Sequence, residues 1–382
     1  MIEFKDIEID GKEYLEINDR VYERKENPVG VRQKFWIVRH EGSLFEESPY
    51  ETNILFKYNR NDVSCEDSGE VISSRFYRRI GLKAVDYYFA RYHRKDGTTV
   101  EGVVCGSFKK DKREVETSAY TLQTNYTEFE FNPTTGVANK EINTVASIMD
   151  DLRFLAGDNK RLLAMLPAIN YTLDKQCLLD FIFAQTDRHW LNTSFLEYVS
   201  NGDYGIRTAK CYDNGCIAFW KRKKQALVTI MNQVKGDYIN SPRMAELMKD
   251  YCPMFGYKTS TVVIDTDRYN KVGHPQKLKL KDPQKHKEIF MDEMAERILI
   301  NPEMAFFYRN MLNVLNYDKA TKQIDPSYLF NEIGLADREI DPVVREMVTA
   351  VMTYQINEMQ KVVNKKLADY KVKLEEEENA KC

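Results

Sequence analysis

No stretch of the 382-residue sequence approaches the roughly 20 consecutive apolar residues that a helix needs to cross a bilayer. The chain starts with MIEFKDIEID, which has acidic side chains where a secretory signal has a basic and then an apolar segment. We therefore expect no membrane partner. We expect the protein to be cytoplasmic, or to leave the cytoplasm only as a delivered effector.

Cysteine is sparse, with 7 residues and no Cys-x-x-Cys pair. Cys211 and Cys216, the two closest in sequence, flank an acidic turn and do not have the spacing of a zinc site. His274 and His286 lie in a lysine-rich stretch, also without the spacing of metal ligands. The Gly-x-Ser-x-Gly elbow of many serine hydrolases is absent as well. The sequence therefore offers no support for zinc chemistry and little for a Ser/His/Asp hydrolase.

Charge of one sign does not dominate, since 56 Lys and Arg residues face 59 Asp and Glu residues and the net charge is −3. This balance argues against a protein that binds nucleic acid over its whole surface. No helix-turn-helix module is visible, and we expect no direct binding of DNA. Basic residues cluster at 109–113, 221–224 and 271–287, and such clusters are most often solvated faces.

What the sequence does contain is a change of hydrophobic period along its first third. Short aromatic and β-branched segments predict strands, and one helical segment between them ends at Gly81. A Lys-Asp-Gly turn at 95–97 predicts a hairpin. The predicted strands are 33–38, 52–58, 84–92 and 99–108, and the predicted helix is 69–81.

From about residue 139 the apolar spacing is helical, apart from two strand-like segments joined by a Ser-Asn-Gly-Asp turn. We therefore predict an α+β protein with a β-rich N-terminal lobe, residues 1–135, and a mostly helical C-terminal lobe, residues 136–382. The connection between them is expected near 133–136. The predicted helices are 152–166, 174–184, 291–300, 305–315 and 341–370, and the predicted hairpin strands are 193–199 and 205–211.

Three polar residues surround the predicted hairpin. Asp187 follows the end of a helix, Asn192 comes five positions later, and Asp213 lies beyond the second strand. In phosphoryl transfer one carboxylate orients the attacking hydroxyl, while another carboxylate and an amide hold magnesium ions. The three residues match that requirement in type and spacing. Taken alone, Asp187-Arg188-His189 also fits a helix end with a capping acid and a local ion pair.

Residues upstream favour the catalytic interpretation. Lys57 ends an apolar strand, where a buried ammonium needs a specific partner, and Glu70 begins the following helix. In protein kinases a strand lysine binds the α- and β-phosphates and pairs with a helix glutamate. Gly30 precedes the first strand, where a glycine lets the backbone approach a phosphate, although this loop has one glycine and not three.

In this order the residues resemble those of the HipA-like kinases, a bacterial family of atypical protein kinases that includes toxin kinases. The resemblance covers roughly residues 27–215. It rests on Gly30-Val31-Arg32-Gln33-Lys34, Leu55-Phe56-Lys57, Glu70 in 69–75, Gly102 to Phe108, Asp187-Arg188-His189 with Asn192, and Tyr212-Asp213-Asn214-Gly215.

The resemblance implies a bilobal protein-kinase-like fold and a Ser/Thr protein kinase that uses ATP and Mg²⁺. It implies a protein substrate of unknown identity, and autophosphorylation. Asp187 would be the catalytic base and His189 an orienting or packing residue. The other implied roles are phosphate binding by Lys57 with Glu70, coordination of Mg²⁺ by Asn192 and Asp213, and covering of the nucleotide by Gly30, Val31, Arg32, Gln33 and Lys34.

Two alternative functions remain open. The same fold can phosphorylate a lipid or a small molecule, and a screen of acceptors separates that case from a protein kinase. The chain can also be a non-catalytic nucleotide-binding module. The presence of all four residues Lys57, Asp187, Asn192 and Asp213 argues against that alternative. The basic run 221–224 follows Asp213 closely, and at an acceptor site it would favour acidic or phosphorylated targets.

Overall fold

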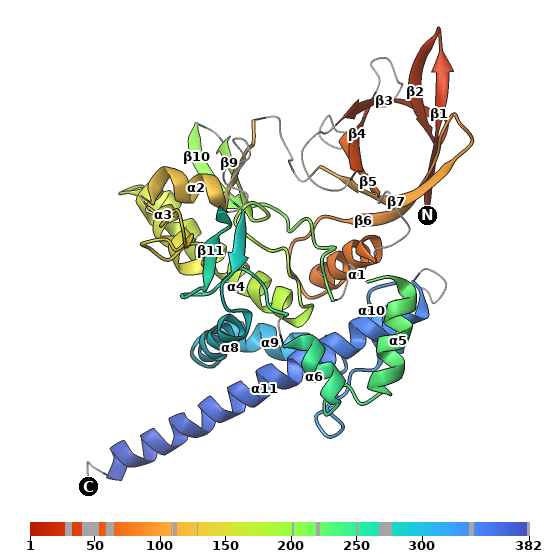
Figure 1. Cartoon of the computed structure of the whole chain (residues 1–382). Helices are drawn as coiled ribbons and strands as arrows, with labels where there is room; N and C mark the ends of the chain where they lie inside the picture. The colour runs from red at the N-terminus through yellow and green to blue at the C-terminus, as the bar shows by residue number, and fades with distance from the viewer. Residues whose placement is uncertain are drawn as a thin grey trace.

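A strand-rich N-terminal region precedes a largely helical C-terminal part in the computed structural model (Figure 1). The model describes residues 1–26, 33–39, 53–58, 65–107, 109, 113–127, 129–200, 202–218, 222–249, 251–266, 277–335 and 340–379. Within these ranges, no helix has the length and apolar character that crossing a membrane requires.

Seven strands of the N-terminal region form one sheet that closes on itself as a barrel, in the order β1-β2-β3-β4-β5-β7-β6. All neighbours are antiparallel except β1 and β6, whose parallel pairing closes the ring. Aromatic side chains fill the interior, with the Phe4 and Tyr92 rings stacked at 4.9 Å. The strands are β1 Ile2–Ile9, β2 Lys12–Ile17, β3 Arg20–Glu26, β4 Gln33–Arg39, β5 Asn53–Tyr58, β6 Tyr87–His93 and β7 Thr99–Gly106.

The strands predicted at 33–38, 52–58, 84–92 and 99–108 are confirmed as β4 to β7, with β6 starting three residues later than predicted. Strands β1 to β3 were not predicted. Their turns carry a sequence signal, however, because Asp10-Gly11 and Asn18-Asp19 are residue types that tolerate positive φ. All four residues have positive φ in the structure, as tight hairpin turns require.

Helix α1, Glu66–Arg79, lies between the barrel and the helical part (Figure 1). It starts three residues before the predicted helix and ends before Gly81, whose φ is +86°. Its apolar face is buried, and the ring centroids of Phe76 and of Phe183 in the helical part are 5.3 Å apart. Contacts of this kind fix the position of α1 relative to the helical part.

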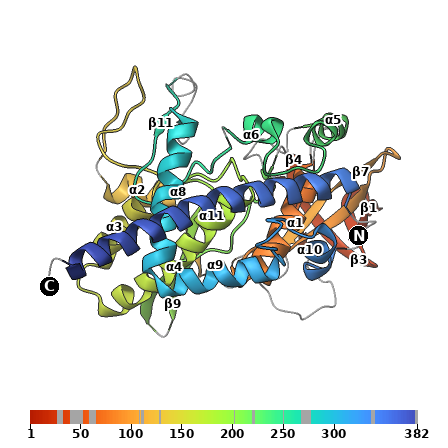
Figure 2. The same cartoon turned by 90° about the horizontal axis from the view of Figure 1, so that it is seen from below.

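The helical part is built around one large core. Its longest helix, α11, packs along α8, α5, α4 and α10, as Figure 2 shows from below. The helices are α2 Ala119–Tyr126, α3 Val145–Ala156, α4 Lys160–Ile182, α5 Lys224–Val234, α6 Pro242–Met248, α8 Pro283–Ile300, α9 Pro302–Val314, α10 Pro326–Glu332 and α11 Pro342–Asn379.

One predicted helix, 152–166, is wrong. The chain leaves the helical conformation at Gly157, and the Asn159 side chain caps a new helix by accepting hydrogen bonds from the backbone of Arg161 and Leu162. The segment 174–184 forms the second half of α4 and extends slightly beyond it. The helices predicted at 291–300, 305–315 and 341–370 are confirmed within α8, α9 and α11.

The predicted hairpin is confirmed as β9, Ser194–Ser200, and β10, Asp203–Thr208. A third strand, β8, Val115–Ser118, adds to β9, while β11, Val262–Ile264, pairs with β12, Leu278–Leu280. The division of the chain at residue 135 stays a prediction. Strand β8 and helix α2 precede that point and pack against β9 and α3, which follow it.

Candidate active site

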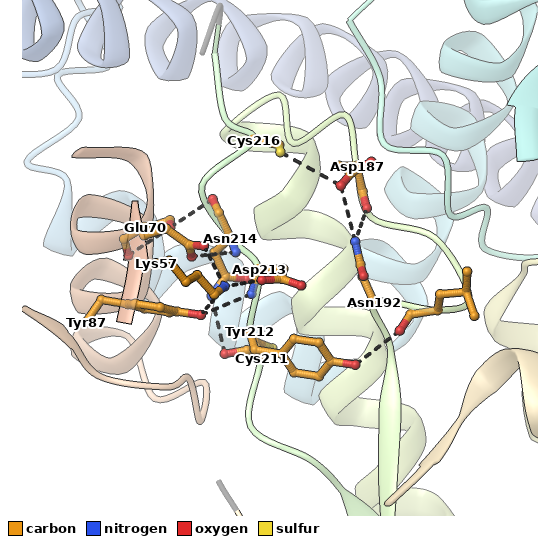
Figure 3. Close-up of polar contacts among 12 residues, drawn as sticks. Lys57, Glu70, Tyr87, Asp187, Asn192, Cys211, Tyr212, Asp213, Asn214 and Cys216 are labelled. Atoms are coloured by element: carbon orange, nitrogen blue, oxygen red, sulfur yellow. Dashed lines mark hydrogen bonds and ion pairs between the residues drawn. The ribbon is translucent and has the colours of Figure 1, made fainter. Parts of the chain in front are cut away.

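Five of the residues singled out in the sequence come together from four separate elements (Figure 3). Lys57 is on β5 and Glu70 is near the start of α1. Asp187 and Asn192 are in the loop between α4 and β9, and Asp213 follows β10. Gly30, Val31 and Arg32 lie outside the described residues.

Lys57 is at the centre of this group and is only 3% exposed. Its Nζ lies 3.1 Å from Glu70 Oε1 and 3.1 Å from the Tyr87 hydroxyl, and it forms an ion pair with Asp213 Oδ1. Burial lowers the pKa of Lys57, but Asp213 and Glu70 outweigh it and hold the pKa well above its usual value. Lys57 is therefore charged, and its partners account for its burial.

Asp213 remains ionised beside this lysine. Burial raises the pKa of the Asp213 carboxyl, but Lys57, and more weakly Lys34, lower it to about 2. Lys34 lies directly across from Lys57 in the β4–β5 pairing, so both side chains leave the same face of the barrel. Gln33 pairs with Tyr58, one position further along the two strands.

Glu70 connects Lys57 to the loop that carries Asp213. Its second oxygen, Oε2, accepts a hydrogen bond of 2.8 Å from the backbone of Asn214. The Ser73 hydroxyl, one turn further along α1, donates to the Asn214 carbonyl at 3.2 Å. Gly69 and Gly215 lie in contact between the helix and the loop, and a β-carbon on Gly215 would come within 2.7 Å of the Glu66 carbonyl oxygen. Small residues at both positions permit this close approach.

Asp187 is accessible to solvent, with its side chain 50% exposed. The Asn192 amide nitrogen donates to the Asp187 carbonyl at 2.8 Å and to Asp187 Oδ2 at 3.3 Å. The buried Gln185 side chain connects this loop to the other one: Oε1 accepts from the Asp187 backbone at 2.9 Å, and Nε2 donates to the Asp213 carbonyl at 3.1 Å. Gln185 was not predicted as a site residue.

Arg188 lies beneath both loops, 1% exposed. Its guanidinium donates to Asp180 Oδ2 at 2.9 Å, to the Asn192 carbonyl at 2.7 Å and to the Tyr212 carbonyl at 2.9 Å, and it also bonds Asn214 Oδ1. The local ion pair considered for Asp187-Arg188-His189 is thus formed by Arg188 with Asp180 on α4. The contacts of Arg188 to the second loop were not predicted.

His189 is oriented by its own loop. Its Nδ1 accepts a 3.2 Å hydrogen bond from the Leu191 backbone, and its Nε2 lies 3.8 Å from Asp187 Oδ1. Burial lowers the pKa of His189. An imidazole that accepts at Nδ1 carries its proton on Nε2, the nitrogen that faces Asp187.

The donor set fits a cation shared with phosphates better than a metal held by protein alone. Asp213 offers an ionised carboxylate, and Asn192 turns its amide nitrogen toward Asp187, so that its oxygen is the atom suited to a cation. Mg²⁺ is commonly bound by one or two carboxylates, with phosphate oxygens and water completing its shell. Across the described ranges, no group of three or more His, Cys, Asp or Glu side chains is placed to hold a metal.

Comparison with known proteins supports the fold. No protein-family model matches the sequence, and no curated protein matches it. The crystal structure of the proinflammatory kinase CtkA of Helicobacter pylori has a TM-score of 0.56 at 12% identity, covering 92% of this chain and 96% of that one. The chain therefore has the fold of a known kinase.

A second solved structure is the Shewanella oneidensis MR-1 toxin–antitoxin complex of HipA, HipB and operator DNA. It has a TM-score of 0.44 at 12% identity and covers 89% of this chain and 67% of that chain. This score lies below the level that indicates a common fold.

Proposed function

We propose that this chain is a bilobal protein kinase of the HipA-like kind, which uses ATP and Mg²⁺ to phosphorylate serine or threonine, its own residues included. The proposal places the two lobes at residues 1–135 and 136–382 and the protein in the cytoplasm. The observation that carries it is the buried Lys57–Glu70 pair in contact with Asp213, next to a loop that presents Asp187 and Asn192. The fold shared with CtkA supports the same conclusion.

Lys57 binds phosphate oxygens of the nucleotide in this proposal. Glu70 fixes the ammonium at 3.1 Å and is itself fixed to the Asn214 backbone at 2.8 Å. Lys34, on the same face of the barrel, adds positive charge. Positioning and charge neutralisation of this kind supply most of the catalysis in phosphoryl transfer.

Asp187 accepts the proton of the substrate hydroxyl, since its carboxylate is accessible from solvent and oriented by Asn192. Asp213 and Asn192 hold Mg²⁺, which neutralises charge on the phosphates when it is bound. Gln185 and Arg188 keep the two loops in register, because each is bonded to both of them.

The proposal is tested by the intact mass of the purified protein after incubation with Mg²⁺ and ATP. Wild type is expected to gain phosphate, and Asp187→Asn and Asp213→Asn to gain none, because the first loses its proton acceptor and the second a cation ligand. Asp158→Asn, an exposed position between α3 and α4, is the matched control and should behave as wild type. Mapping the modified residue identifies the acceptor type.

Two results would count against the proposal in different ways. Transfer by Asp187→Asn and Asp213→Asn at the wild-type rate would show that the site is wrongly assigned. Nucleotide binding without transfer to the chain itself, to proteins of a lysate or to any acceptor in a lipid and small-molecule screen would show a binding module in place of a kinase.

A further inference from the structure

Tyr87 is at the centre of the candidate site, although no sequence pattern pointed to it. It is the first residue of β6 and is 1% exposed. Its hydroxyl accepts a hydrogen bond from Lys57 Nζ at 3.1 Å and another from the Asp213 backbone at 3.3 Å (Figure 3). One hydroxyl thus touches both the lysine and the loop of the aspartate.

All three donors of the Lys57 ammonium are engaged. A lysine ammonium has three N–H groups, and here the partners are Glu70, Tyr87 and Asp213. A phosphate oxygen can therefore bind Lys57 only if one partner is exchanged. Asp213 is the exchangeable one, since its carboxylate is the candidate cation ligand and is about one third exposed, whereas Glu70 is buried.

We propose that Tyr87 is a positioning residue of the nucleotide site, which holds Lys57 and the Asp213 backbone in place while Lys57 exchanges Asp213 for a phosphate oxygen. This inference rests on the proposed function. A neutral hydroxyl suits the task, because it accepts from the ammonium without adding a further anion where phosphate binds.

The same strand offers a matched control. Tyr92 is also 1% exposed, and its hydroxyl donates to Asp6 at 2.6 Å and accepts from Arg24 at 3.3 Å. It lies in the barrel core against Phe4 and Phe56, on the opposite face of the sheet from the Lys57 side chain. Tyr87→Phe and Tyr92→Phe each remove one buried hydroxyl from β6 and keep the ring, but only the Tyr87 hydroxyl bonds Lys57 and the Asp213 backbone.

The test measures the affinity for Mg²⁺-ATP by titration calorimetry in wild type, Tyr87→Phe, Tyr92→Phe, Lys57→Met and the double variant Lys57→Met/Tyr87→Phe. Loss of a hydrogen bond to a charged group should weaken binding by about tenfold in Tyr87→Phe. Tyr92→Phe should stay within about twofold of wild type. In the Lys57→Met background, the tyrosine substitution should weaken binding clearly less than in wild type, because the bond to the ammonium is already absent and only the bond to the Asp213 backbone is lost.

Thermal unfolding of all five proteins separates positioning from packing. A purely structural role of Tyr87 would lower the melting temperature and reduce affinity equally with or without Lys57, and that result overturns the inference. Unchanged affinity in Tyr87→Phe overturns it too, while leaving the proposed function intact. Failure of wild type to bind Mg²⁺-ATP overturns the proposed function and, with it, this inference.

Discussion

Replacing Arg188 by methionine should be the most destabilising single change in the site. The guanidinium is bonded to Asp180, to two carbonyls and to Asn214, and its removal leaves the carboxylate of Asp180 buried without its cation. Breaking a buried pair by removing one partner costs about 3–5 kcal/mol. An exposed pair such as Arg153 with Asp150 contributes well under about 1 kcal/mol, so Arg153→Met is the control.

The pH dependence of the stability lost in Arg188→Met identifies the cause of that loss. Burial already raises the pKa of Asp180, against the opposing effect of Arg188. Without the arginine this pKa rises further, so the folded state retains a proton that the unfolded state has lost. The cost of Arg188→Met must therefore grow as the pH rises above the raised pKa of Asp180 in the folded wild type.

Urea unfolding of Arg188→Met, Asp180→Asn/Arg188→Met and Arg153→Met, followed by tryptophan fluorescence, measures these differences. The double variant should recover at least about half of the lost stability, because no uncompensated carboxylate remains. It should still transfer phosphate poorly, since the two loops lose their shared donor. Stability of Arg188→Met within about 1 kcal/mol of wild type, or a double variant no more stable than the single one, would refute the argument.

Two further predictions concern α1 and the stability of the fold. Gly215→Ala should reduce phosphate transfer more than Gly106→Ala in the same assay, because its β-carbon meets the Glu66 carbonyl at 2.7 Å and Glu70 Cγ at 2.8 Å, while nothing lies within 4 Å at position 106. Equal activity of the two variants would contradict it. Burial raises the pKa of Asp151 to about 6 from 3.8, so the folded state binds the extra proton and stability falls as pH rises across that interval. Asp151→Asn should remove this fall, on the order of 2 kcal/mol, and urea midpoints that keep the wild-type pH profile would contradict it.

Local sequence patterns predicted the individual elements better than their assembly. β4 to β7 and the β9–β10 hairpin have clear alternation and turn residues, and both were predicted. Strands β1 to β3 are rich in charged residues, and β1 completes the barrel by pairing with β6, more than eighty positions away in the chain. The helix predicted across Gly157 failed because apolar spacing continues through a capped break.

The same distinction applies to the residues of the site, of which local patterns revealed some and missed others. Asp187, Asn192 and Asp213 were found because their spacing around a hairpin is a local property, and Lys57 and Glu70 because a lysine at the end of an apolar strand is unusual. Tyr87 and Gln185 are ordinary residues in their own segments. They acquire a role only through contacts with Lys57 and with Asp213, which no single segment of sequence contains.

Closure of the barrel has a consequence for the lysine that β5 carries. In an open sheet β6 would be a terminal strand, held from one side only, but residues Ile2 to Lys5 pair with Ala90 to His93 and give it a second neighbour. A closed ring cannot bend at one strand without stretching hydrogen bonds in the others. The paired segment of β1 therefore stiffens β6, the strand that carries Tyr87. Residues 2–5, which are remote in sequence from every loop of the site, thus help to hold Lys57 at a fixed distance from those loops.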